Sequence, residues 1–133
     1  MTQRTIVLDA SVGVKWLKRE VGSDEALALL EDAAAGEVLI VVPAVFPHEV
    51  LDVARRRRGH SVAREFWAHI HELGVLVAGT DVDLIQATLA TAEALECTVY
   101  DAAAPALAER LGCPLASADR RAHGRVAGVR LLG

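Results

Sequence analysis

Short apolar runs rich in β-branched residues alternate along this chain with longer segments of helical character. Each run has the length of a strand and lacks the alternating polar residues of a half-exposed strand, which predicts burial on both faces. Strands of this kind that are joined by helical crossovers form a parallel sheet covered by helices. We therefore expect an α/β fold with a central parallel sheet of four to five short strands and helices on both faces. The expected strands are Arg4–Leu8, Glu37–Val42, Val75–Ala78, Pro114–Ser117 and Val129–Leu132.

Helical periodicity and helix-ending residues divide the rest of the chain. Gly59 separates two expected helices, and Gly36 and Gly112 lie just beyond the ends of two others. Pro105 falls in the first turns of a helix, where proline is tolerated best. The 133 residues fit one domain, 1–133. The expected helices are Ser11–Lys18, Ser23–Ala35, Ala44–Arg58, Ser61–Leu73, Asp81–Glu96 and Ala102–Leu111.

The composition excludes several classes of protein. A hydrophobic content of 53% is too high for intrinsic disorder. No apolar run approaches the roughly 18 residues of a membrane span, and the N-terminus leads directly into a strand without the features of a signal peptide. We therefore expect a cytoplasmic protein that does not associate with a membrane. Two cysteines, Cys97 and Cys113, are too few for a disulfide scaffold.

Acidic residues stand at the ends of the predicted strands. Asp9 directly follows the first strand, and Asp119 comes shortly after Pro114–Ser117. Asp101 follows the segment Thr98-Val99-Tyr100 and begins the next helix. The carboxyl ends of strands in such sheets form the functional crevice, so these acids are expected to meet there. An Asp before a helix can also be an N-cap that accepts a backbone N–H, and for each residue taken singly that interpretation stays open.

Glu49 adds a fourth carboxylate from the first turns of the helix after the second strand. Carboxylates that converge raise one another's pKa values, and a divalent cation relieves this repulsion. Mg²⁺ prefers oxygen ligands and keeps several waters, and Mn²⁺ accepts the same ligands. A metal held in this way activates water and stabilises charge on phosphate oxygens. The pattern indicates phosphoryl chemistry.

The net charge of −4 argues against binding of nucleic acid through bulk charge. Arginines are nevertheless clustered, and arginine binds phosphate through paired hydrogen bonds. We expect them to form a basic rim that holds a nucleic-acid backbone, although the run on the helix could also be a solvated helix end that complements the helix dipole. The clustered arginines are Arg55, Arg56, Arg57, Arg58, Arg120 and Arg121.

Four segments, in order, resemble the motifs of PIN-domain ribonucleases, and among them the VapC-type toxins of prokaryotic toxin–antitoxin pairs. The resemblance covers nearly the whole chain. Its segments are Val7-Leu8-Asp9-Ala10-Ser11-Val12 with Lys15-Trp16-Leu17, Val42-Pro43 to Glu49-Val50, Val99-Tyr100-Asp101-Ala102-Ala103 with Leu107 to Gly112, and Ser117-Ala118-Asp119-Arg120-Arg121.

The resemblance implies a Mg²⁺-dependent endoribonuclease, with Mn²⁺ as a possible substitute, that cleaves single-stranded RNA. Asp9 and Asp101 would be the direct metal ligands, and Glu49 and Asp119 would complete the site directly or through water. It also implies a small antitoxin partner, whose tail would occupy a groove and reach arginines near the site, and a homodimer.

Three further residues are assigned supporting roles by the resemblance. Ser117 and Ser11 could hydrogen-bond the carboxylates or a ligating water. Asp52 stands where many relatives carry Asn, so it either adds charge to the site or pairs with Arg55 or Arg56.

Other functions remain as alternatives. A housekeeping PIN nuclease that is not a toxin, or a catalytically silent PIN-fold binding module, would carry the same residues. A phosphoacceptor receiver domain needs paired acids after its first strand, but Ala10 follows Asp9. It also needs a late lysine, and this chain has only Lys15 and Lys18. The five histidines and two tryptophans are expected to have packing, interface or surface roles.

Overall fold

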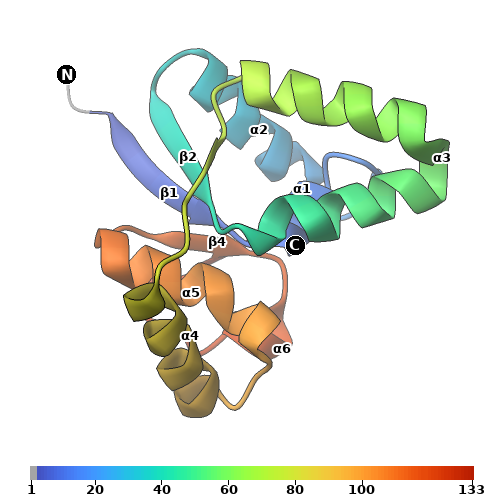
Figure 1. The fold of residues 1–133 in the computed structure, drawn as a ribbon. Coiled ribbons are helices and arrows are strands. Elements are labelled where there is room, and N and C mark those ends of the chain that lie inside the picture. The colour runs from blue at the N-terminus through green and yellow to red at the C-terminus, as the bar shows by residue number, and fades with distance from the viewer. Residues whose placement is uncertain (1–2) are drawn as a thin grey trace.

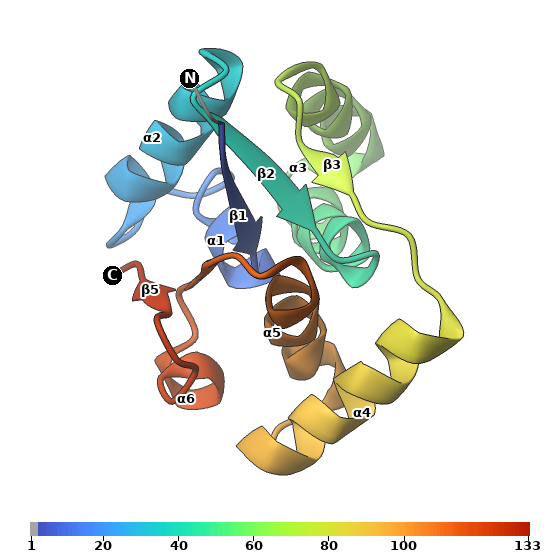
Figure 2. The ribbon, with the colours of Figure 1, turned by 90° about the vertical axis from the view of Figure 1, so that its left-hand side faces the viewer.

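A computed structural model describes residues 3–133 and shows five parallel strands in a single sheet. The strand order is β3-β2-β1-β4-β5, so the first strand of the chain lies at the centre (Figure 2). The predicted α/β class and parallel sheet are confirmed, while residues 1 and 2 of the expected domain lie outside the described residues. The strands are β1 Arg4–Leu8, β2 Val38–Val42, β3 Leu76–Val77, β4 Leu115–Ser117 and β5 Arg130–Leu131.

The helices lie at nearly the predicted places along the chain. Gly59 interrupts α3 with φ 87° and ψ 170°, which divides the helix into two arms at the predicted position. Figure 1 shows the two arms meeting at this bend. The helices are α1 Ala10–Val14, α2 Ser23–Ala34, α3 Val45–Glu72, α4 Val82–Leu95, α5 Val99–Leu111 and α6 Arg120–His123.

Alternating side chains of the central strand supply two separate cores. Leu8 packs on one face of the sheet, among side chains of α1, α2 and α3 such as Phe46. Val7 points to the opposite face and packs against Leu84 of α4 and Leu107 of α5. Helices therefore cover both faces, as predicted, and Figure 1 shows the two groups on either side of the sheet.

Most boundaries agree with the prediction to within one residue, two differ by three or four residues, and the short helix α6 was not predicted. Helix α1 ends at Val14 rather than Lys18. Helix α5 begins at Val99 rather than Ala102, because the Thr98 side chain caps it by accepting a hydrogen bond from the Asp101 N–H at 3.0 Å. Asp101 therefore lies in the first turn of a helix and does not follow a strand. Within residues 3–133, no helix combines the length and the apolar character that a membrane crossing requires.

Candidate functional site

Asp9 and Asp119 are placed side by side by two neighbouring strands. Asp9 directly follows β1, and its N–H donates to the carbonyl of Ala116 in β4 at 3.0 Å. The Asp9 carboxylate caps α1 by accepting from the Ser11 N–H, and the Asp119 carboxylate caps α6 by accepting from the Ala122 N–H, both at 3.0 Å. Each cap occupies one oxygen of a carboxylate that has two. Capping and a second role are therefore compatible at both positions.

Glu49 lies within electrostatic reach of two of the other acids. It projects from the first arm of α3, and its side chain as a whole is exposed although the carboxyl group is partly shielded. This partial desolvation raises the pKa of Glu49 above 4.5, and the negative charges of Asp9 and then Asp101 raise it further. The fold thus brings Asp9 and Asp101 close enough to Glu49 for their charges to affect its carboxyl group.

Asp101 also faces Asp119 across a cleft. Both half-buried acids line this cleft of about 480 Å³, together with Cys97, Arg121 and Arg125. Burial raises the pKa of the Cys97 thiol, and the charge of Asp101 adds to the effect. Asp101 therefore belongs both to the Asp9–Glu49 group and to the cleft that contains Asp119.

The chemistry of these donors fits a hard divalent cation. All four predicted site acids offer carboxylate oxygens, the ligand type that Mg²⁺ and Mn²⁺ accept. Partial burial is the main cause of the raised pKa of Glu49, and the like charges of Asp9 and Asp101, which a cation would neutralise, add to it. Across residues 3–133, however, no three His, Cys, Asp or Glu side chains are gathered closely enough to hold an ion together.

The two predicted supporting serines bind backbone groups. The buried Ser117 hydroxyl accepts from the Asp119 N–H at 3.0 Å, and the Ser11 hydroxyl accepts from the Ala118 N–H at 2.9 Å. The two hydroxyl oxygens are 3.4 Å apart. Together they fix the turn between β4 and α6, which carries Asp119.

His123 is a site neighbour that the sequence did not single out. Its ring is fully buried, with Nδ1 2.6 Å from the Ser117 hydroxyl and Nε2 2.6 Å from the Asp101 carbonyl oxygen. The general assignment of the histidines to structural or surface roles did not separate this residue from the other four. Its position four residues after Asp119, on the same side of a helix, is the signal that could have identified it.

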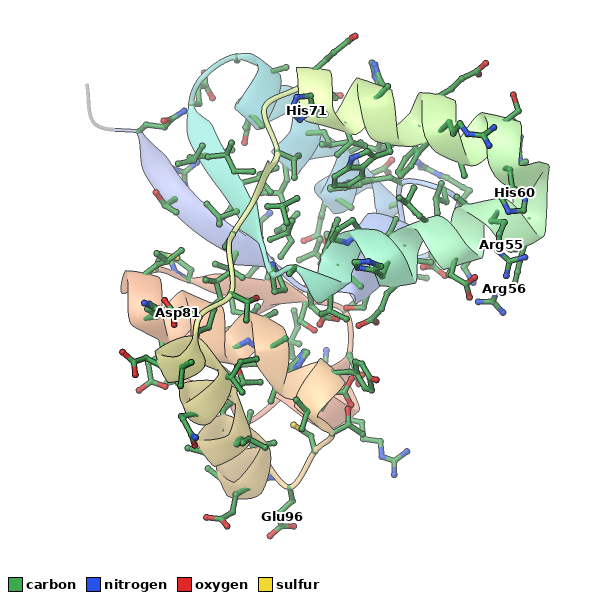
Figure 3. All side chains as sticks on the ribbon, viewed as in Figure 1. Arg55, Arg56, His60, His71, Asp81 and Glu96 are labelled. Carbon is green, nitrogen blue, oxygen red and sulfur yellow. The ribbon has the colours of Figure 1, made fainter. Side chains whose placement is uncertain are left out.

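Asp52 and the arginine run lie apart from the cleft. The Asp52 carboxylate accepts from Arg55 at 2.6 Å and pairs with Arg56 at 3.4 Å. The hydrogen bond from Arg55 lowers the pKa of Asp52. Figure 3 shows Arg55 and Arg56 near the bend of α3, at the end away from the sheet. Of the two alternatives for Asp52, the structure shows the pairing with the arginines.

A groove separates the two arms of α3. Its volume is about 530 Å³, and its wall includes the apolar side chains of Leu51 and Trp67 and the basic side chains of Arg55 and Arg64. His60 lies on the second arm near the bend and also lines the groove (Figure 3). The exposed Arg57 and Arg58 follow on the same arm as Arg55. Arg55 is thus the residue of the arginine run that lines this groove, whereas Arg121 lies at the acidic cleft.

Solved structures with the same fold come from several bacteria. The VapC20 toxin of Mycobacterium tuberculosis, which cleaves the sarcin–ricin loop, matches with a TM-score of 0.73 and 18% identity over 96% of this chain and 99% of its own. A toxin–antitoxin complex from Klebsiella pneumoniae matches with a TM-score of 0.75 and 14% identity, over 93% and 94% of the two chains. DNA-bound VapBC of Salmonella typhimurium matches with a TM-score of 0.63 and 16% identity, over 97% of each chain.

The family assignment comes from the sequence of the chain as a whole. A search of curated proteins gave no significant match. The family model of the PIN domain, however, matches residues 6–129, which include every acid discussed above. The chain therefore belongs to the PIN domain family.

Proposed function

We propose that this protein is a metal-dependent endoribonuclease that cleaves single-stranded RNA, and that it is the toxin of a toxin–antitoxin pair. The observation that supports the activity most directly is the proximity of Asp9, Glu49 and Asp101: their charges add to the effect of burial in raising the pKa of Glu49, and Asp101 shares a cleft with Asp119. Carboxylates crowded in this way form the kind of centre that binds Mg²⁺ in nucleases. The similarity of fold to the RNA-cleaving VapC20 toxin supports the substrate class.

Each acid has a distinct part in the proposed site. Asp9 and Asp101 hold the Mg²⁺ or Mn²⁺ ion, and Glu49 and Asp119 complete the site directly or through water. The bound cation supplies activation of a water molecule and neutralisation of charge on the phosphate. Arg121 and Arg125 line the same cleft and are suited to orient the phosphodiester through hydrogen bonds. The hydroxyls of Ser11 and Ser117 keep the Asp119 turn in place.

The proposed partners use surfaces outside the cleft. An antitoxin segment with apolar and acidic side chains would fit the groove between the arms of α3, because the groove has Leu51 and Trp67 on its wall and Arg55 and Arg64 at its edge. A second copy of the chain would cover the exposed apolar side chains of α4. We propose that the protein acts in the cytoplasm, as its sequence suggests.

The decisive experiment is cleavage of a panel of labelled single-stranded RNAs with Mg²⁺ and with excess EDTA. We expect cleavage by the wild type in Mg²⁺ and none in EDTA. Asp9→Asn keeps the cap on α1, because the amide oxygen still accepts from the Ser11 N–H, but it removes a ligand charge. Its activity should fall by at least about 100-fold, at the upper end of the loss seen when a metal site is disturbed. Asp83→Asn, an exposed change in the first turn of α4, is the matched control and should cleave like the wild type.

Two results would contradict the proposed activity, and a third would contradict the assignment as a toxin. Equal cleavage by wild type and Asp9→Asn in EDTA would show a contaminant or a metal-free reaction. A folded wild type that cleaves none of a broad RNA panel and binds no divalent cation would favour the catalytically silent binding module. An active enzyme whose gene stands alone, without a neighbouring short reading frame for an antitoxin, would favour the housekeeping nuclease.

A further inference from the structure

A proline removes the normal helical partner of one backbone group beside the site. In an α-helix, each carbonyl accepts from the N–H four residues later, so the partner of the Asp101 carbonyl would be the N–H of residue 105. That residue is Pro105, which has no N–H, although α5 continues through it to Leu111. The Asp101 carbonyl therefore needs a donor from elsewhere, because a buried acceptor without a partner is costly.

His123 supplies that donor. Its Nε2 lies 2.6 Å from the Asp101 carbonyl oxygen, which can only accept, so the ring hydrogen is on Nε2. In the neutral ring, this tautomer leaves Nδ1 as the acceptor of the Ser117 hydroxyl at 2.6 Å. The Ser117 oxygen in turn accepts from the Asp119 N–H at 3.0 Å. A continuous chain of hydrogen bonds thus joins the backbone of Asp101 to the backbone of Asp119.

We propose that His123 is a positioning residue that sets the spacing between Asp101 and Asp119 by binding the carbonyl that Pro105 leaves without a helical donor. Asp101 is in the first turn of α5 and Asp119 is in the turn after β4. The His123 ring is fully buried and binds a group of each element. Loss of the ring contact would let the start of α5 move relative to the β4 turn. The inference rests on the proposed metal site.

Three substitutions of His123 distinguish the hydrogen bond made by Nε2 from the one made by Nδ1. In His123→Gln, the side-chain amide reaches the position of Nε2 and can still donate to the Asp101 carbonyl. In His123→Asn, the shorter amide reaches only the position of Nδ1 and keeps the contact with Ser117. His123→Phe keeps an aromatic ring, somewhat larger than the imidazole, and keeps neither hydrogen bond. Pro105→Ala restores the helical N–H and should make the Asp101 carbonyl independent of His123.

The affinity of each purified full-length variant for Mn²⁺ is measured by titration, with the free ion quantified by electron paramagnetic resonance. The stability of each variant is measured separately by urea denaturation without metal. Wild type and His123→Gln should bind with similar affinity. His123→Asn and His123→Phe should bind about 10-fold more weakly or worse, the loss typical when a residue that orients a ligand is changed. Pro105→Ala combined with His123→Phe should recover much of the affinity. Asp101→Asn should lose Mn²⁺ binding, which would show that the measured ion is the one at the proposed site.

The outcomes distinguish this inference from the proposed function. A wild type that binds no Mn²⁺ would overturn the metal site and the inference with it. A wild type that binds in an Asp101-dependent way, with His123→Phe equal to it, would overturn the inference alone, because a residue that only stabilises the fold lowers urea stability without changing the affinity of the folded protein. If His123→Phe does not fold, equal affinities of the Gln and Asn variants would overturn the inference in the same way.

Discussion

At the scale of single residues, the acids of this site serve folding and chemistry together. Asp9 and Asp119 each cap a helix through one carboxylate oxygen, which ties their backbone positions to the ends of two adjacent strands. Within residues 3–133, no comparable hydrogen bond to the Glu49 carboxylate offsets the repulsion from its acidic neighbours. The metal-free protein therefore carries an electrostatic strain that is concentrated on Glu49.

The raised pKa of Glu49 predicts how the stability of the protein depends on pH. Because the folded-state pKa of Glu49 is raised above 4.5, the folded chain holds a proton more tightly than the unfolded chain, and stability falls as pH rises through the raised value. Glu49→Gln removes this penalty. In the presence of a chelator, the variant should melt at a higher temperature than wild type at pH 7.

The difference between Glu49→Gln and wild type should disappear as the pH falls below 4.5, where the wild-type carboxyl is protonated in both states. Melting curves recorded by circular dichroism across this range test the expectation. Glu93→Gln changes an exposed carboxylate of α4 and serves as the control for loss of one charge. The prediction is contradicted if Glu49→Gln melts at a lower temperature than wild type at pH 7. It is also contradicted if the difference in melting temperature grows as the pH falls.

At the scale of elements, local sequence signals predicted which segments form strands and helices, whereas tertiary contacts determined some element boundaries and the role of His123. The first strand is observed with its predicted bounds, and the helix break at Gly59 was also predicted, because both depend on local sequence. The start of α5 was predicted three residues too late, because the strand-like composition of Thr98-Val99-Tyr100 concealed a helix cap. The role of His123 depends on a residue eighteen positions away, Pro105, and no local pattern contains that relation.

The bend of α3 yields a prediction about stability. Gly59 combines φ 87° with ψ 170°, a region that is almost restricted to glycine. A Cβ at this position would meet no atom within 4 Å, so the effect of a substitution isolates backbone strain. Gly59→Ala should lower the free energy of unfolding by about 1–3 kcal/mol, measured by urea denaturation.

Gly79 provides the matched control for that measurement. A Cβ there would also meet no atom within 4 Å, but its φ lies outside the positive range. Gly79→Ala should leave stability unchanged or raise it by up to about 1 kcal/mol, because alanine restricts the unfolded chain. Equal effects of the two substitutions would show that the second arm of α3 adjusts its direction freely.

At the scale of the whole molecule, one helix carries more apolar surface than the domain covers. Leu84 and Thr88 of α4 are buried, and this helix packs mainly on α5. Val82, Ile85 and Leu89 lie at helical spacing on an adjacent face and are 76%, 46% and 48% exposed. An exposed apolar row next to a buried face is typical of a surface that associates with another protein. In the proposed homodimer, the second copy of the chain covers this row.

The last prediction tests the homodimer through this row of α4. Ile85→Glu places a charge in the middle of the proposed contact, where it would be buried without a partner on dimer formation. We expect the wild type to sediment as a dimer and Ile85→Glu to sediment as a monomer with unchanged helical content. Val21→Glu adds the same charge at an exposed apolar residue between α1 and α2, and should remain dimeric. A monomeric wild type would refute the homodimer, and a dimeric Ile85→Glu would place its interface on another surface.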